Sequence, residues 1–192
     1  TVSGVWKSRH YCDKVRSQLR RFIPLLYDST VQSILGKTID LPLCEPKFKV
    51  QTSSDLHRYT KAALIRDQET EHYPYRLIHT PKQTVWASRP HKYQEGYKVF
   101  ISLTDRYKVF VDQDCGMTQS IAFITCLNQA DAELIKGILE HPLYIFLNNI
   151  CRWGNFNNVR ILQSFPIPRD PADIYGSFGI SEHEQEYIEA NL

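Results

Sequence analysis

The sequence predicts an α+β fold, with an N-terminal amphipathic helix, a central mixed or antiparallel sheet, and then a C-terminal helix pair and a short tail helix. Three observations predict it. Apolar residues recur at steps of three and four before residue 26, occur in strand-like runs between about residues 48 and 126, and return to helical spacing after Asn128. A chain of 192 residues, of which 42% are hydrophobic, can build one large domain or two small ones.

The first predicted element is a helix over residues 6–26. Its apolar stripe consists of Tyr11, Val15, Leu19, Phe22 and Leu26. Basic residues flank the stripe on both sides, with Arg9, Arg16 and Arg20 on one shoulder and Lys7, Lys14 and Arg21 on the other. Two interpretations stay open. In the first, these side chains bind phosphate groups. In the second, their long stems only cover the edge of the apolar stripe.

Turn-rich sequence that includes Pro42 and Pro46 separates this helix from a series of short strands. We expect strands at residues 48–52, 62–65, 75–79, 84–87, 97–103, 107–111 and 120–126. Segments 97–103 and 107–111 alternate apolar and polar residues across a polar connection, so they are predicted to form a hairpin. Asp112 and Asp114 follow it and are predicted to form a turn, because two carboxylates supply too few ligands for a hard cation.

Helical spacing returns with Asn128, which is the expected N-cap of a helix that ends at His141. Pro142 is well placed to open a second helix, since proline at the first helical position loses no hydrogen bond. The predicted buried stripes are Leu134, Ile135, Ile138 and Leu139 in the first helix and Leu143, Phe146, Leu147 and Ile150 in the second.

The last part of the chain is predicted to be a separate unit. Prolines at positions 166, 168 and 171 mark a linker, and Ser181 and Glu184 form a capping box that opens an acidic helix ending near residue 190. We therefore divide the chain into a domain over residues 1–168 and a linker with an acidic helix over residues 169–192.

Composition excludes several classes of protein. Charged residues interrupt even the most apolar segment, 121–150, so we expect a soluble protein with no membrane partner. The five cysteines are irregularly spaced without a Cys-x-x-Cys pair, which disfavours a disulfide framework or a zinc site and favours a reducing cytoplasm. Because the first residue is Thr1 and no secretory signal precedes the fold, we expect a piece of a longer polypeptide.

Charge and loop composition point towards a polyanion. Residues 1–96 carry 16 Lys and Arg against 9 Asp and Glu, whereas residues 97–192 carry 7 against 12. Two polar loops, 79–93 and 152–158, interleave basic, aromatic and amide side chains. Arg and Asn suit the edges of bases, while Lys and hydroxyl groups suit phosphates. The alternative for each loop is an ordinary turn.

Four segments follow one another in the second half of the chain: KVFI at 98–101, DQDCGMTQS at 112–120, AELIKGILEHPL at 132–143 and LQSFPIP at 162–168. In this order they resemble the target-recognition domain of adenine-specific DNA methyltransferases from bacterial restriction-modification systems, including single-chain enzymes that also cut. The resemblance covers roughly residues 75–190. The chain departs from the family at His141 and Pro142, where relatives often have Asn-Ser.

The resemblance implies that this chain reads double-stranded DNA as a partner of a catalytic methyltransferase domain in the same longer polypeptide. That domain would bind S-adenosylmethionine, with Mg²⁺ if the enzyme also cleaves, and flip the target adenine. The chain itself contains neither the glycine-rich cofactor motif nor the Asn/Asp-Pro-Pro-aromatic motif, so we expect no cofactor in it. The candidate DNA contacts are Arg9, Arg16, Arg20, Arg89, His91, Lys92, Thr118, Ser120, Arg152, Asn155 and Asn157.

Two alternative functions stay open. The first is a metal-dependent nuclease in which Asp28 or Asp40 holds a divalent ion together with Glu45, beside Lys47. The second is a subunit-interaction domain of a modification complex, which would use the acidic tail helix and need no DNA contact.

Overall fold

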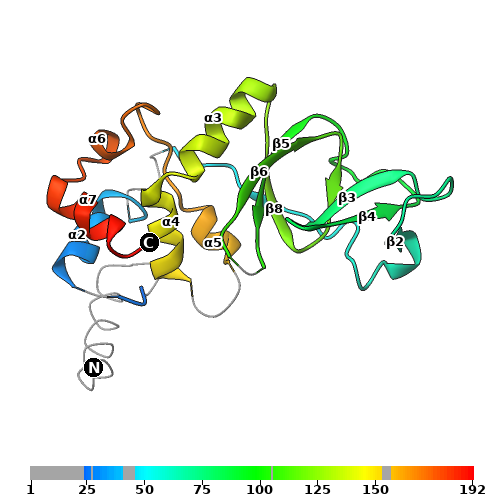
Figure 1. Ribbon diagram of the computed structural model, residues 1–192, viewed down its shortest axis with the longest axis horizontal. Coiled ribbons are helices and arrows are strands. Elements are labelled where there is room, and N and C mark those ends of the chain that lie inside the picture. The colour runs from blue at the N-terminus through cyan, green and yellow to red at the C-terminus, as the bar shows by residue number, and fades with distance from the viewer. Residues whose placement is uncertain (1–23, 27, 41–45, 105, 153–156) are drawn as a thin grey trace, which may run out of the picture.

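The computed structural model describes residues 24–26, 28–40, 46–104, 106–152 and 157–192, and the helix predicted over residues 6–26 lies almost entirely outside them. The molecule has a strand-rich half, here residues 51–126, and a helical half formed by α2 and residues 127–192 (Figure 1). The helices are α2 (Ser29–Lys37), α3 (Gln129–Leu139), α4 (Pro142–Cys151), α5 (Val159–Leu162), α6 (Ile174–Phe178) and α7 (Glu182–Glu189), with the 3-10 turn η1 (Ala62–Leu64).

Two four-stranded sheets make up the strand-rich half, so the α+β prediction is confirmed. The first sheet is antiparallel in the order β1-β8-β5-β6, with β1 (Gln51–Thr52), β8 (Ile121–Thr125), β5 (Tyr97–Ser102) and β6 (Val109–Gln113). The second has the order β2-β4-β3-β7, with β2 (Ile65–Arg66), β4 (Gln83–Ala87), β3 (Tyr75–Thr80) and β7 (Gly116–Met117), and β7 joins it parallel to β3.

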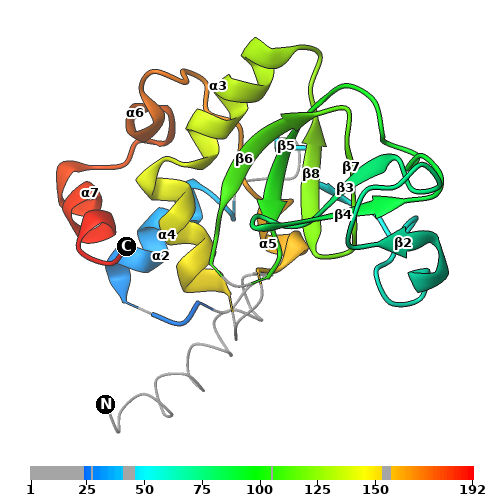
Figure 2. The same cartoon turned by 45° about the vertical axis from the view of Figure 1, so that its right-hand side comes forward.

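The predicted hairpin is confirmed. Strands β5 and β6 pair antiparallel, with Val99 opposite Val111 and Phe100 opposite Phe110, and the two phenylalanine rings stack with centroids 5.5 Å apart. β8 adds to the other side of β5. α3 then packs on β5 and β6, which places the helical half against the first sheet (Figures 1 and 2).

The two helices predicted directly after residue 127 form as α3 and α4, whereas α5 and α6, the latter within the predicted linker, were not predicted. The Asn128 side chain accepts a hydrogen bond from the amide of Asp131, and Pro142 occupies the first turn of α4. The stripe predicted for α4 is buried, but in α3 Leu134 is 52% exposed. Ala132 of α3 is buried in the main core instead of Leu134, so the small side chain of the helix faces inward.

Two other local predictions are wrong. Segment 62–65 is a 3-10 turn for three of its four residues, with exposed alanines at 62 and 63 that bury no apolar surface, and only Ile65 pairs as a strand. The turn-rich region before residue 42 contains α2, which Asp28 caps and which buries Val31, Ile34 and Leu35 against the core.

The tail packs onto the rest of the helical half. The capping box of Ser181 and Glu184 forms as predicted, and Glu184 accepts hydrogen bonds from Lys37 of α2 at 2.6 and 2.9 Å. The hydroxyl of Tyr187 donates to Asp28, and Ile188 joins the main core. Among the helices of the described residues, none combines the length and the apolar character that a membrane crossing requires.

A separate core joins the two sheets. Ile78 of β3 and Met117 of β7 pack with Phe100 of β5 and Phe123 of β8. This cluster fixes the second sheet, with its loops, relative to the first.

Candidate nucleic-acid interface

Four of the predicted DNA contacts, Arg9, Arg16, Arg20 and Asn155, lie outside the described residues. The other seven fall into two groups. One group, Arg89 to Lys92, lies on the loop between β4 and β5, and the other follows β7 and α4.

Asp55 holds the first group in place. Its carboxylate accepts two hydrogen bonds from the Arg89 guanidinium, at 2.8 and 3.2 Å, and one from the backbone amide of Lys92 at 3.0 Å. The hydrogen bond from Arg89 is the main reason why the pKa of Asp55 falls to about 2. The Lys92 ammonium lies 4.9 Å from the centre of the Tyr93 ring. The side chains of Arg89 and Lys92 stay exposed, on a loop that these hydrogen bonds attach to Asp55.

His91 lies on the same loop but points into the protein, where its side chain is buried. Its Nδ1 accepts a hydrogen bond from the amide of Tyr93, so Nε2 carries the proton and donates to Ser53 Oγ at 2.9 Å. Burial lowers the pKa of His91 to about 4, which keeps the ring neutral near pH 7. His91 therefore packs the loop rather than facing a ligand.

Thr118 and Ser120 are also buried. The Thr118 hydroxyl shares a 2.8 Å hydrogen bond with His79 Nδ1, and the Ser120 carbonyl accepts from the amide of Leu103 at 3.0 Å. These two residues join the β7–β8 turn to β3 and to the end of β5. We assign them to the support of the interface rather than to its surface.

Asn157 occupies the centre of a buried hydrogen-bond network at the end of β5. Its Nδ2 donates to the Ser102 carbonyl at 2.8 Å, and its backbone amide donates to the Leu103 carbonyl at 3.0 Å. Its Oδ1 accepts from Asn148 Nδ2 at 2.9 Å and from Arg152 Nη1 at 3.2 Å. The oxygen and the nitrogen of the Asn157 side chain are both engaged within the protein, so Asn157 joins the end of β5 to α4 rather than facing a ligand.

Replacement of Asn157 by alanine is expected to lower the free energy of unfolding by about 2 kcal/mol, because it leaves buried partners on Asn148 and Ser102 unsatisfied. Urea unfolding followed by circular dichroism measures the change. The matched control is Asn149→Ala, at a half-buried position of α4 next to Asn148. It should cost clearly less. Equal costs would contradict the network.

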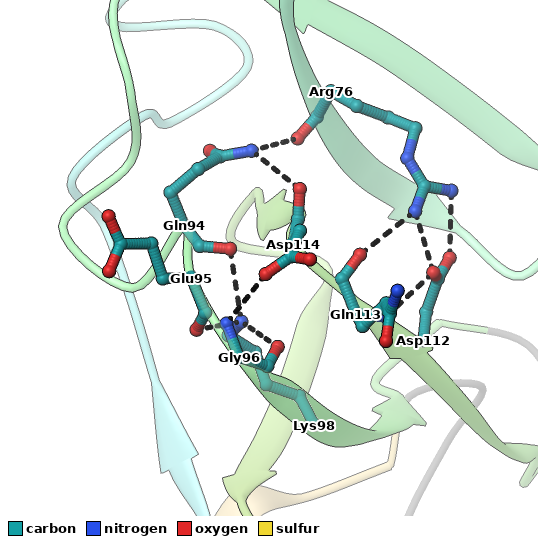
Figure 3. A network of polar contacts seen from close by, with 8 residues as sticks. All are labelled: Arg76, Gln94, Glu95, Gly96, Lys98, Asp112, Gln113 and Asp114. Atoms are coloured by element: carbon teal, nitrogen blue, oxygen red, sulfur yellow. Dashed lines mark hydrogen bonds and ion pairs between the residues drawn. The ribbon is translucent and has the colours of Figure 1, made fainter. Parts of the chain in front are cut away.

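A second polar network fastens the β5–β6 hairpin to β3 (Figure 3). Arg76 of β3 forms a bidentate ion pair with Asp112, at 2.6 and 2.8 Å, which raises the pKa of Arg76. Asp114 adopts a left-handed conformation with φ of 51° and accepts from the amide of Gly96 at 2.9 Å. Asp112 thus acts in an ion pair, and Asp114 acts in the turn. The described residues contain no group of three His, Cys, Asp or Glu side chains that could hold a metal ion.

Lys98 completes this network from within the sheet. Its side chain is fully buried, and its ammonium donates to the carbonyls of Gln94, Glu95 and Gly96 at 3.2, 2.8 and 2.9 Å (Figure 3). Burial lowers the pKa of Lys98, but three carbonyl acceptors and nearby Asp112 and Asp114 favour its charged form. The network anchors the loop that carries Arg89 and Lys92 at its C-terminal end.

The analysis of the sequence missed an exposed aromatic side chain beside basic ones. Tyr59 is 74% exposed and lies between Arg58 and Lys61 on the loop that precedes η1. The amides of Tyr59 and Thr60 donate to His57 Nδ1, and the amide of Arg58 donates to Gln119, which fix this loop. The interleaving of basic and aromatic residues over 57–61 was the available signal, since bases stack on such rings.

Exposed basic side chains without a carboxylate partner gather in the strand-rich half. Arg58, Arg76 and Arg89 pair with described carboxylates. Within residues 51–126, six exposed residues form no ion pair with any carboxylate of the described chain: Lys61, Arg66, Lys82, Lys92, Arg106 and Lys108. Lys49, Arg160 and Arg169, which lie outside this half, also form none. Residues 127–192 of the helical half, in contrast, carry 4 Lys and Arg against 9 Asp and Glu.

The structure bears on two carboxylates of the nuclease alternative. Glu45 lies outside the described residues, and Asp28 uses both carboxylate oxygens within the fold, one for the amide of Val31 and one for the hydroxyl of Tyr187.

No protein-family model matches the chain, and no curated protein matches it.

Proposed function

We propose that this chain is a DNA-recognition module of a bacterial adenine-specific DNA methyltransferase of a restriction-modification system. The catalytic domain of the same longer polypeptide would be its partner and would bind S-adenosylmethionine, with Mg²⁺ needed only if the enzyme also cleaves. The proposal places the protein in the cytoplasm. The described cysteines, Cys115, Cys126 and Cys151, are free, which agrees with a reducing compartment.

The observation that carries this proposal is the set of six exposed basic side chains in the strand-rich half that form no ion pair with a described carboxylate. A polyanion is the partner that such a surface attracts, because each Lys or Arg that neutralises a phosphate releases a counterion. Tyr59 adds an exposed ring on a fixed loop beside Lys61. The residues suited to bases, above all Arg152, would then decide which sequence is preferred.

Binding of the full chain to a fluorescein-labelled DNA duplex of mixed sequence tests the proposal by fluorescence anisotropy at low salt. We expect a Kd that rises steeply with salt, with a slope in log units of about 0.9 for each phosphate neutralised. Lys92→Gln should raise Kd by about threefold to tenfold and reduce the slope by about one.

The matched control is Lys136→Gln, which removes the same charge from α3, where Lys136 pairs with Glu140. It should leave Kd nearly unchanged. No binding of the duplex at low salt, or equal losses in the two variants, would contradict the proposal.

A further inference from the structure

A hollow of about 300 Å³ lies between the β3–β4 turn and the connection that follows β5. One wall is Thr80, Pro81 and Lys82, and the other is formed by Ser102, Thr104, Arg106 and Lys108. The two walls come from different sheets, whose common core of Ile78 and Phe100 fixes their relative position.

Three of the seven described residues that line the hollow carry a positive charge. Lys82, Arg106 and Lys108 are exposed cations, and none forms an ion pair with a described carboxylate. The hydroxyl of Thr80 accepts from the amide of Lys82 at 3.3 Å and keeps its own proton for donation. A planar guanidinium, two ammonium groups and a hydroxyl together match a phosphate, whose oxygens accept from all sides.

The position of the hollow favours a phosphate of a nucleic-acid backbone over that of a free small molecule. Ser102 lines the hollow, and its carbonyl accepts the hydrogen bond from Asn157 Nδ2. Asn157 in turn accepts from Arg152, the described candidate for a base contact. A phosphate in the hollow would therefore lie near Arg152, as expected where backbone contacts set the register of the duplex.

We infer that this hollow binds a backbone phosphate of DNA through Lys82, Arg106 and Lys108. The inference rests on the proposed function and adds a specific phosphate site to it. Lys82 reaches the phosphate from the β3–β4 turn, while Arg106 and Lys108 reach it from the opposite wall. The hollow would fix the position of the duplex without contributing sequence preference of its own.

The test combines two substitutions, Lys82→Gln and Lys108→Gln, one from each wall, in the full chain. Duplex binding by fluorescence anisotropy should weaken by about tenfold or more, and the salt slope should fall by about two, for all DNA sequences alike. A double variant of matched charge, Lys136→Gln with Arg160→Gln, changes half-buried Lys136 of α3 and exposed Arg160 of α5 and should retain most of the affinity. Thermal melting checks that both variants fold.

A second arm separates the failure of this inference from the failure of the proposed function. Line broadening in ³¹P NMR reports binding of inorganic phosphate to the wild-type chain and to the double variant. If the wild type binds duplex and the Lys82→Gln/Lys108→Gln variant binds it equally well, the hollow is not the phosphate site, although the proposed function stands. If only inorganic phosphate binds, and the variant abolishes this, the ligand is a free phosphate and the DNA assignment is overturned.

Discussion

Replacement of Gly116 by alanine is expected to destabilise the fold by about 3 kcal/mol or more, because the position has no room for a side chain. A Cβ built there would lie 2.4 Å from the Cβ of His91 and 2.7 Å from a methyl carbon of Leu77. The Cβ of His91 is bonded directly to its backbone, and the Leu77 methyl, although it ends its side chain, belongs to a fully buried residue. The backbone of β7 or of the loop that carries Arg89 and Lys92 would have to move.

Gly137→Ala supplies the matched control. No atom lies within 4 Å of the Cβ that would be added at Gly137, which is in the interior of α3. Alanine there should be neutral or stabilise the protein by about 0.5–1 kcal/mol, because glycine is a poor helix former. Urea unfolding of both variants measures the difference. Similar midpoints for the two would show that β7 does not approach His91 as closely as described.

The elements that depend on local sequence were predictable. The N-cap at Asn128, the proline that opens α4 and the capping box at Ser181 each act within four residues, so their sequence patterns are sufficient. The β5–β6 hairpin is similarly local. α2 was missed although Asp28 and the stripe of Val31, Ile34 and Leu35 were present, because neighbouring turn signals drew the interpretation towards a loop.

The candidate interface was less predictable, because burial depends on partners far along the chain. His91 bonds to Ser53, 38 residues earlier, and Thr118 bonds to His79, 39 residues earlier. Neither distance leaves a pattern in the sequence, so both residues resembled exposed loop positions. The hollow has the same origin, since Lys82 and Lys108 approach only because Ile78 and Phe100 pack the two sheets together.

Three histidines make the protein sensitive to acid. Burial lowers the pKa of His91 to about 4 and lowers the pKa of His79 and of His141 as well. In the unfolded chain these rings take up protons near pH 6.5, whereas in the fold they stay neutral to a lower pH. The unfolded state therefore binds more protons between about pH 6.5 and pH 4, and stability falls as the pH falls through this window.

The free energy of unfolding is accordingly expected to drop by about 3 kcal/mol from His91 alone between pH 7 and pH 4, with further loss from His79 and His141. Below pH 4 the loss continues, because hydrogen bonds from Arg89 and Lys37 hold the pKa of Asp55 and Glu184 near 2. Urea unfolding across this range measures the slope. His91→Gln should lower stability at pH 7 but flatten the slope above pH 4. A slope in His91→Gln as steep as that of the wild type would mean that His91 is not neutral in the fold.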